Sequence, residues 1–497
     1  MDLLTNIYRN ITLHDVWMLG TVTLCLFVIL DDFFIDFLAF ITGAKPRQLT
    51  KEEFSVMNDL RQKKLAIMIA NWHEAEVLER MVTGNVAHID YQNYTIFLGV
   101  YPNDRETLEA ARQAERKLSN VKVIVNTKEG PTSKGQMINE MVSFIADSNK
   151  KSDEPYDMVI THDAEDVIHK YALKLINLRA ESYDFIQIPV FSQPTPLKEL
   201  TAGIYIDEFT DSHTKIMLVR DRCKGGVLSA GVGTAVSTSV VSQLLRLQNG
   251  QFLKENTLTE DYFLGLTCYD LGIKSNFAAE YIGHTDVKTG ITVRDYIATR
   301  EFFPQAIKAS VKQKTRWTMG ICLQGYEQET PENKGFFGAY FIWKDRKGLL
   351  CAPLFISSVI FSLAFMGAYF QTGYWPELDY MPLNNIFIML MWANLILSGV
   401  RLAERIGLVN EVYGLGVASL VPVRWLLGNF INNAATFNAI YRWTVSKIKG
   451  EIPKWSKTDH IIPAGFGIIS PEPVPVLVEI PVVIAENVKK IAKECLN

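Results

Sequence analysis

Long apolar runs lie near both ends of the chain, and a mixed, charged region separates them. Three runs without a charge cover residues 16–30, 350–370 and 383–400, and the first continues past Asp31 and Asp32 through residues 33–40, which include Asp36. A helix needs about 20 apolar residues to cross a bilayer. We therefore predict a transmembrane helix within residues 1–42 and two spans within a membrane domain over residues 343–440.

A further apolar run, residues 413–439, contains one charge, Arg424, and several asparagines. We predict an interfacial or re-entrant segment, because a charge at mid-span costs a few kcal/mol, on the order of 3, on insertion scales. Arg424 would bind a lipid phosphate or a translocating sugar, or would snorkel to the interface. Basic residues after this run make residues 441–497 a cytoplasmic tail, and those after the first run place the central region in the cytoplasm.

The central region alternates between short apolar runs and polar helical stretches. The apolar runs cover residues 65–70, 95–100, 121–125, 158–161 and 185–189, and helical stretches include 106–118 and 134–147. This alternation predicts an α/β fold with a doubly wound parallel sheet. Ligands of such sheets bind beyond the carboxyl ends of the strands, so the residues that follow each run are candidates for a site.

Composition narrows the possible functions. The formal net charge of −4 implies no long basic surface, so nucleic acid is not an expected partner. The six cysteines are scattered without a CxxC pair. That pattern argues against a structural zinc site or a disulfide framework and fits a reducing compartment.

Three carboxylates follow the fourth apolar run of the central region. Asp163 and Glu165 are two residues apart just beyond its end, and Asp166 comes next. Carboxylates at this spacing can reach one hard cation, Mg²⁺ or Mn²⁺, which holds phosphate oxygens. An acidic turn that caps the next helix is the alternative. We predict Asp163 and Glu165 as metal ligands, with Asp166 as the alternative to Glu165.

Two later motifs add further chemistry. In a Thr-Glu-Asp tripeptide, Glu260 and Asp261 offer carboxylates, one of which can act as a general base, although the same tripeptide also caps helices. Gln313 and Arg316 share one face of a predicted helix, and Trp317 follows them. Arginine can pair with a diphosphate and tryptophan can stack on a sugar ring. Anchoring of this helix at the membrane surface is the alternative.

In this order, and followed by membrane helices, the acidic pair, the Thr-Glu-Asp tripeptide and the Gln-x-x-Arg-Trp motif resemble family 2 glycosyltransferases. These include the processive synthases of cellulose, hyaluronan and poly-N-acetylglucosamine. The resemblance covers roughly residues 60–440. It implies a GT-A-like nucleotide-sugar domain over residues 60–335, cytoplasmic and inserted between transmembrane helices, that catalyses inverting transfer from a UDP-sugar.

The resemblance also implies roles by position. Glu74 and Asp104 would contact the uracil or ribose, and Lys134 would approach uracil or phosphate from a glycine-flanked loop. Gly231 and Gly233 would let the backbone approach the donor sugar. On the acceptor side, the base would be Asp261 beside Glu260, and the acceptor end would be lined by Gln313, Arg316 and Trp317.

Segments such as residues 31–36, 205–209 and 343–348 resemble the bacterial inner-membrane phage-adsorption proteins within this family. That implies a multi-pass inner-membrane protein that builds and exports an exopolysaccharide from a UDP-N-acetylhexosamine, a polymer that serves as phage receptor. Its implied partners are the UDP-sugar, the growing polysaccharide, membrane lipid and an outer-membrane export or phage-adsorption protein. Relatives carry a C-terminal cyclic-di-GMP-binding domain that this sequence is too short to hold, so the resemblance leaves open whether that nucleotide controls the protein.

Two other functions compete with polymer synthesis. Single-step transfer to a polyprenyl phosphate also uses family 2 domains with membrane anchors, but it needs no Gln-x-x-Arg-Trp helix. A catalytically inactive nucleotide-binding receptor or scaffold is the second alternative, and the intact carboxylates at Asp163, Glu165 and Asp261 argue against it.

Overall fold

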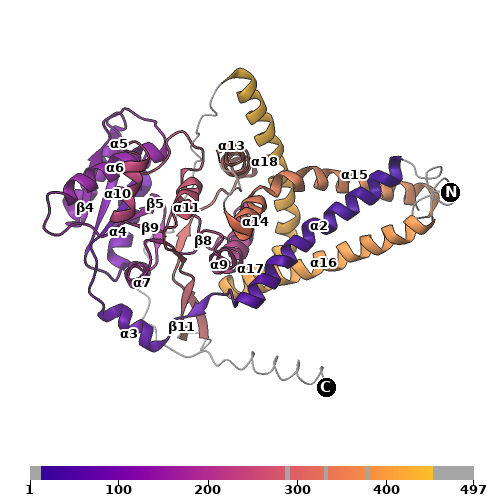
Figure 1. Cartoon of the computed structure of the whole chain (residues 1–497), viewed down its shortest axis with the longest axis horizontal. Helices are drawn as coiled ribbons and strands as arrows, with labels where there is room; N and C mark the ends of the chain where they lie inside the picture. The colour runs from indigo at the N-terminus through magenta and orange to yellow at the C-terminus, as the bar shows by residue number, and fades with distance from the viewer. Residues whose placement is uncertain (1–12, 286–291, 329–333, 375–380, 451–497) are drawn as a thin grey trace.

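The structure, a computed structural model, describes residues 13–285, 292–328, 334–374 and 381–450. An α/β domain forms one end of the molecule, and long helices project from it toward the other end (Figure 1).

A seven-stranded sheet forms the centre of the α/β domain. Its strands, in spatial order, are β10 (Ser275–Phe277), β7 (Phe185–Gln187), β9 (Thr234–Ser237), β5 (Met158–His162), β2 (Leu65–Ala70), β3 (Tyr94–Val100) and β4 (Val121–Val125). The α/β class is confirmed, and the predicted parallel sheet is parallel except at one strand. β9 runs antiparallel between β5 and β7. It is a four-residue strand that begins with threonine and ends with serine, so no apolar run in the sequence predicts it.

Helices cover both faces of this sheet. They are α4 (Ala75–His88), α5 (Arg105–Lys117), α6 (Lys134–Asn149), α7 (Ala172–Arg179), α10 (Thr238–Leu247) and α11 (Glu260–Asp270). α5 and α6 match the two predicted helical stretches to within two residues. The side chain of Asp104 accepts a hydrogen bond at the start of α5, and that of Ser133 does so at the start of α6, as helix N-caps do.

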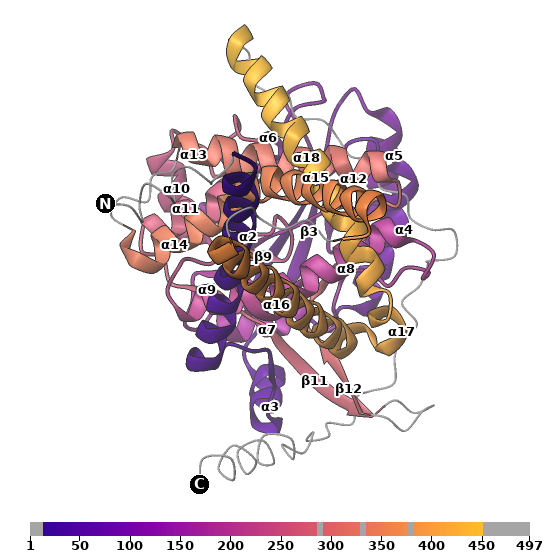
Figure 2. The ribbon, with the colours of Figure 1, turned by 90° about the vertical axis from the view of Figure 1, so that its right-hand side faces the viewer.

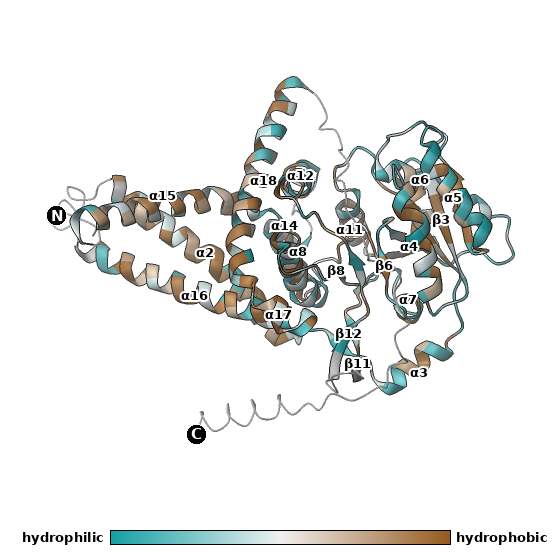
Figure 3. Ribbon diagram, turned by 180° about the vertical axis from the view of Figure 1, so that it is seen from behind, coloured by the Kyte–Doolittle hydropathy of each residue, from teal (hydrophilic) through white to brown (hydrophobic). Residues whose placement is uncertain are grey.

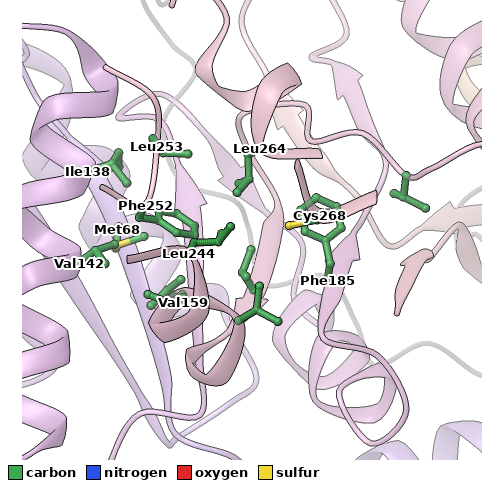
Figure 4. Close-up of a cluster of buried hydrophobic side chains, with 14 of the residues drawn as sticks. Met68, Ile138, Val142, Val159, Phe185, Leu244, Phe252, Leu253, Leu264 and Cys268 are labelled. Atoms are coloured by element: carbon green, nitrogen blue, oxygen red, sulfur yellow. The ribbon is translucent and has the colours of Figure 1, made fainter. Parts of the chain in front are cut away.

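Alternate residues of β2 pack into two different hydrophobic cores, because successive side chains of a strand point to opposite faces. Ala66 and Met68 join the core that also holds Phe185 and Phe252 (Figure 4). Leu65, Ile67 and Ile69 join the core on the other face. Burial on both faces explains why the strand reads as a continuous apolar run.

Two small sheets flank the large one. One contains β6 (Val167–Ile168), β13 (Thr299–Glu301) and β8 (Val190–Ser192), with β13 in the middle. The other contains β1 (Arg47–Gln48), β11 (Glu280–Thr285) and β12 (Thr292–Tyr296). β6 follows directly on the acidic turn after β5, and β13 pairs with it antiparallel. The first small sheet therefore brings the end of β13 beside that turn.

Three long helices project side by side from the α/β domain (Figures 1 and 2). They are α2 (Leu13–Thr42), α15 (Gly348–Thr372) and α16 (Met381–Tyr413). α15 and the Leu383–Tyr413 part of α16 are long and apolar enough to cross a membrane, and only 6% of each apolar window is buried. Figure 3, which is coloured by hydropathy, shows hydrophobic residues along the length of α15 and α16. α15 contains the predicted span at residues 350–370. α16 contains the predicted span at residues 383–400 and continues well beyond residue 400.

The acids that interrupt the first apolar run are paired with basic residues at the base of the projecting helices. Asp31 accepts hydrogen bonds from Lys344 and Lys347, both at 2.8 Å. Asp36 accepts from Lys215 at 2.7 Å and pairs with Arg401 at 3.1 Å. α2 is thereby tied to the α/β domain and to α16.

The run at residues 413–439 does not form one segment. It holds the end of α16, the short helix α17 (Leu415–Ala418) and most of α18 (Val421–Lys449). α18 runs across the base of the projecting helices (Figure 1). It also contains the first residues of the predicted tail, and the tail beyond residue 450 lies outside the described residues.

Arg424 of α18 is buried in the protein. Its Nε and Nη2 donate to the carboxylate of Asp207 at 2.9 and 2.7 Å, and Nη2 also donates to the carbonyl of Val417 at 2.9 Å. Asp207 belongs to α8 (Leu200–Asp211), where a Cβ on Gly203 would lie 2.5 Å from Arg424 Cδ. The prediction that Arg424 binds lipid or sugar, or snorkels, is therefore wrong, because the side chain joins α18 to the α/β domain.

Candidate active site

A cavity of about 430 Å³ lies beyond the carboxyl ends of β2 and β5. Most of the predicted site residues line it, namely Glu74, Lys134, Asp163, Glu165, Gly231, Glu260, Asp261, Gln313, Arg316 and Trp317. They come from stretches more than 200 residues apart in the sequence. The position agrees with the rule that ligands of such sheets bind at the carboxyl ends of the strands.

Three carboxylates meet on one side of the cavity. Asp163, Glu165 and Glu301 each offer an oxygen, and these oxygens lie within 4.8 Å of one another. Glu301 ends β13, whose pairing with β6 brings it next to the turn that holds the other two acids. The sequence analysis missed Glu301, because a single acid after a polar strand carries no local signal.

Asp166 turns away from this cluster. Its Oδ2 lies 2.8 Å from His162 Nδ1 and accepts the backbone N–H of Asp163 at 2.9 Å. The carboxylate is almost fully buried and does not line the cavity. The structure therefore places Glu165, not Asp166, beside Asp163 and Glu301, while Asp166 shapes the turn.

Lys134, the first residue of α6, is the cation next to the carboxylates. Its Nζ lies 2.5 Å from Asp163 Oδ1 and donates to the carbonyl of Gly231 at 3.2 Å. Burial opposes its charge, but Asp163, Glu260 and Asp261 outweigh burial and raise the pKa of Lys134. Burial, together with the charges of neighbouring acids, raises the pKa of Glu301 well above its ordinary value. The all-oxygen donor set and its excess negative charge fit a hard divalent cation.

Glu260 and Asp261 form the first turn of α11. Asp261 Oδ1 accepts the backbone N–H of Tyr262 at 2.8 Å. Burial raises the pKa of Asp261, and burial and the neighbouring Asp261 raise that of Glu260 to about 7. A buried carboxylate with a raised pKa binds a proton more readily than an exposed one, which suits a general base at neutral pH.

The two predicted glycines differ in what they do. Gly231 has a φ of +81°, and a Cβ there would lie 2.8 Å from Asp261 Oδ2, so this position needs glycine for conformation and for space. Gly233 does not line the cavity. A Cβ on Gly233 would meet Thr299 Oγ1 at 2.7 Å, so Gly233 allows close packing behind the site.

The Gln-x-x-Arg-Trp motif lies in α12 (Ile307–Thr318), across the cavity from α6. Arg316 Nη1 donates to the carbonyl of Leu258 at 3.1 Å. Gln313 Oε1 and Arg316 Nε are buried and have no hydrogen-bond partner within the described residues, so both can serve a ligand. Trp317 packs edge-on against Tyr205, with ring centroids 6.0 Å apart.

A second cavity of about 400 Å³ adjoins the first and shares Glu208, Trp317 and Ile321 with it. It lies between α12, α15 and α18, and much of its lining is polar, including Asn429, Asn432, Asn433 and Thr436. Asn432 Nδ2 donates to Glu208 Oε1 at 2.9 Å, and Lys314 Nζ donates to Asn432 Oδ1 at 2.8 Å. Trp317 therefore stands where the site meets a polar space beside the projecting helices.

Glu74 and Asp104 are both predicted to contact the nucleoside, but only Glu74 lines the cavity. Glu74 lines the cavity at the start of α4, whereas Asp104 is buried outside it. Asp104 accepts the backbone N–H of His73 at 2.7 Å and so fixes the turn after β2. Trp72 and Tyr101, which the sequence analysis did not single out, line the cavity edge-on to each other, with centroids 5.2 Å apart. Their rings offer the kind of surface on which a base can stack.

Comparison with known proteins identifies related sequences. The family model described as "Glycosyltransferase like family 2" matches residues 62–320. Bacteriophage adsorption protein B of Escherichia coli K12 is 30% identical over 460 residues, which cover 88% of this chain and 61% of the relative. Bacteriophage N4 adsorption protein B of Escherichia coli O157:H7 matches to the same extent. The chain thus spans about three fifths of the length of these curated relatives.

Solved structures show more distant likenesses. A mannosyltransferase from Pyrobaculum calidifontis, in complex with GDP-Man and Mn²⁺, is 11% identical with a TM-score of 0.45, over 77% of this chain and 97% of that one. S. aureus TarS 1–349, in complex with UDP-GlcNAc, is 14% identical with a TM-score of 0.35, over 78% of this chain and 92% of that one.

Proposed function

Because this chain belongs to glycosyltransferase family 2, and is a glycosyltransferase with helices that suit a membrane, we propose that it catalyses inverting, metal-dependent transfer from a UDP-sugar. The observation that carries this proposal is the gathering around one cavity of three carboxylates, a lysine, the half-buried Asp261 and the Gln-x-x-Arg-Trp helix. Each group has a distinct task in a single displacement at the anomeric carbon.

The carboxylate cluster is the proposed site for Mg²⁺ or Mn²⁺. Asp163, Glu165 and Glu301 would hold the ion, which would supply positive charge to the donor diphosphate. Lys134 lies beside them and would approach the same phosphates. On the nucleoside side, Glu74 lines the cavity near the Trp72 and Tyr101 rings, which would receive the uracil.

Asp261 is the proposed general base. Its carboxylate takes the proton of an acceptor hydroxyl as that oxygen bonds to the anomeric carbon. The bond between this carbon and the phosphate oxygen breaks, and UDP leaves from the opposite face, which inverts the configuration. Burial and the negative charge of the neighbouring Asp261 keep the pKa of Glu260 raised.

The acceptor is proposed to be the end of a growing polysaccharide. Trp317 would stack on its terminal sugar, and Gln313 and Arg316 would supply hydrogen bonds from their unpartnered atoms. The adjoining polar cavity would receive the chain on its way to the projecting helices. We propose that the product is an exported polymer of an N-acetylhexosamine that serves as phage receptor, with an outer-membrane export or adsorption protein as a further partner; the likeness to proteins named for bacteriophage adsorption supports the link to phage.

We further propose that the protein is a multi-pass protein of the bacterial inner membrane, with the α/β domain in the cytoplasm. α2, α15 and α16 would span, and α18 would lie along the cytoplasmic interface. The ion pairs of Asp31 and Asp36 at the base of α2 support this orientation, because they bring the charges to one level beside the α/β domain. The direction of α18 across the projecting helices supports an interfacial position (Figure 1).

This topology predicts a cytoplasmic C-terminus. A fluorescent reporter fused after the last residue is expected to be bright, and alkaline phosphatase at the same place is expected to be inactive. Fusions in the connection between α15 and α16 serve as the control and are expected to give the opposite pattern. Active phosphatase at the C-terminus would show that a fourth segment spans.

The activity is tested with purified protein in detergent, a panel of UDP-sugars and either Mg²⁺ or Mn²⁺. We expect UDP release with one UDP-N-acetylhexosamine, dependence on the metal and a product of high mass. Product of one sugar on added polyprenyl phosphate, without polymer, would favour single-step transfer. Nucleotide binding without any UDP release would favour an inactive receptor or scaffold.

A further inference from the structure

We infer that Tyr262, Asp345 and Arg220 form a buried brace that positions the general base from the membrane side of the protein. The inference rests on the proposed role of Asp261. Asp345 is the penultimate residue of α14 (Gly335–Arg346), and the apolar helix α15 begins three residues later at Gly348. Tyr262 is the residue that follows Asp261 in α11.

The contacts of the brace are short and buried. The hydroxyl of Tyr262 donates to Asp345 Oδ2 at 3.0 Å. Arg220 Nη1 lies 2.8 and 2.9 Å from the two oxygens of the same carboxylate. Arg220 and Tyr262 are 2% and 3% exposed, and the side chain of Asp345, which borders the second cavity, is 16% exposed. Burial and the charge of Asp345 raise the pKa of the Tyr262 phenol, which keeps it a hydrogen-bond donor.

The brace also holds the loop that faces Asp261. Arg220 Nε donates to the carbonyls of Gly225 and Gly226 at 3.2 and 2.7 Å, at the start of the loop that leads to Gly231. α11 rests directly on this loop, because a Cβ on Gly265 would lie 2.8 Å from Leu228 Cα. The helix that carries the base and the loop that abuts it are thus fixed by one carboxylate and one guanidinium.

Tyr262 transmits this placement to the base. Its backbone N–H donates to Asp261 Oδ1, while Gly231 leaves room for Oδ2. A shift of α11 therefore moves the catalytic carboxylate relative to Gly231. Misplacement of a reacting group by about 1 Å can cost about 100-fold in rate. Arg220 lines neither cavity, so it can act on the reaction only through these neighbours.

The brace is tested with Tyr262→Phe and Arg220→Lys in the full-length protein, by UDP release. We expect each variant to lower kcat by about 10- to 100-fold, with the donor KM within about twofold. Because both act through Asp345, the double variant should lose little more than the worse single variant. Tyr340→Phe is the matched control, since its hydroxyl also donates to a carboxylate, Asp31 Oδ1 at 2.7 Å, and Tyr340 lines neither cavity. It should keep the kcat of the parent.

Several results would overturn the inference. A parental kcat in Tyr262→Phe, an equal loss in Tyr340→Phe, or multiplicative losses in the double variant would each do so. A rise in donor KM with unchanged kcat would assign Tyr262 to substrate contact. If Arg220→Lys does not fold, Tyr262→Phe alone decides. Asp261→Asn is measured alongside: turnover in that variant would refute the proposed base itself, whereas an inactive Asp261→Asn with an unimpaired Tyr262→Phe would refute only the brace.

Discussion

Replacing Asp261 with asparagine is expected to lower kcat by about 100- to 10,000-fold, the usual cost of losing a general base. Asparagine has nearly the same shape but cannot accept the proton of the acceptor hydroxyl. The affinity for UDP should stay nearly unchanged, because the proposed phosphate contacts come from Lys134 and the carboxylate cluster. UDP release and UDP binding by calorimetry measure the two effects separately.

Asp270→Asn is the matched control for this variant. Asp270 lies at the other end of α11 and pairs with Lys334, away from the cavity, so its replacement should leave kcat within about twofold, as for most surface changes. Near-parental turnover in folded Asp261→Asn would remove Asp261 from the mechanism.

Because the pKa values of the Glu260 and Asp261 carboxyls are raised, the rate that depends on Asp261 as the base should vary with pH. Below that pKa, the carboxyl is protonated and cannot act as a base, so kcat/KM should fall as the pH is lowered. Because burial raises the pKa in the folded state, the fold binds the proton more tightly than the unfolded chain does, and ionisation costs stability. As the pH rises above about 4, where the unfolded carboxyl ionises, the wild type should lose thermal stability relative to Asp261→Asn. A Tm difference that does not grow with pH would contradict this linkage.

Removing a ligand from the carboxylate cluster is expected to have the second large effect. Asp163→Asn and Glu301→Gln should each weaken Mn²⁺ binding by at least about 10-fold, because each removes one of three anionic oxygens from the ion. Binding is measured by electron paramagnetic resonance of free Mn²⁺ in the presence of UDP, together with the Mn²⁺-dependent rise in Tm. Chelation with EDTA should abolish UDP release.

Glu181→Gln is the control for the metal variants, since Glu181 is exposed and pairs with Lys63 on the surface. It should bind Mn²⁺ like the parent. Parental Mn²⁺ affinity in Glu301→Gln would exclude Glu301 as a ligand, and parental affinity in Asp163→Asn would place the metal elsewhere.

The structure also shows how α18 is attached to the α/β domain that holds the candidate site. Arg424 does not meet lipid but is paired with Asp207, so α18 is joined to the α/β domain by a buried ion pair. Lys314 of the Gln-x-x-Arg-Trp helix bonds to Asn432 of α18. α12, the proposed acceptor helix, and α18, the proposed interfacial helix, are therefore in direct contact. Movement of one of these helices would displace the other.

Sequence alone determined the elements whose signal is local. Strands β2 and β4 begin and end at the predicted residues: β2 is an uninterrupted apolar run, as expected of a buried parallel strand, and β4 is apolar except for the exposed Lys122. The family was equally visible, because its motifs are short and each is contiguous, and residues 62–320 match the family model. The acids after β5 could be singled out because strand ends in such a sheet face the ligand.

Tertiary structure alone decided the features that depend on residues far apart in the chain. β9 has too few apolar residues to be recognised, and only its pairing with β5 and β7 makes it a strand. Glu301 joins Asp163 because β13 pairs with β6, more than 130 residues earlier in the sequence. Arg424 looked like a charge in an apolar run, and its partner lies 217 residues away. Hydrophobic periodicity reports which face of an element is buried, but the partner of a buried charge is set by packing, which no local pattern records.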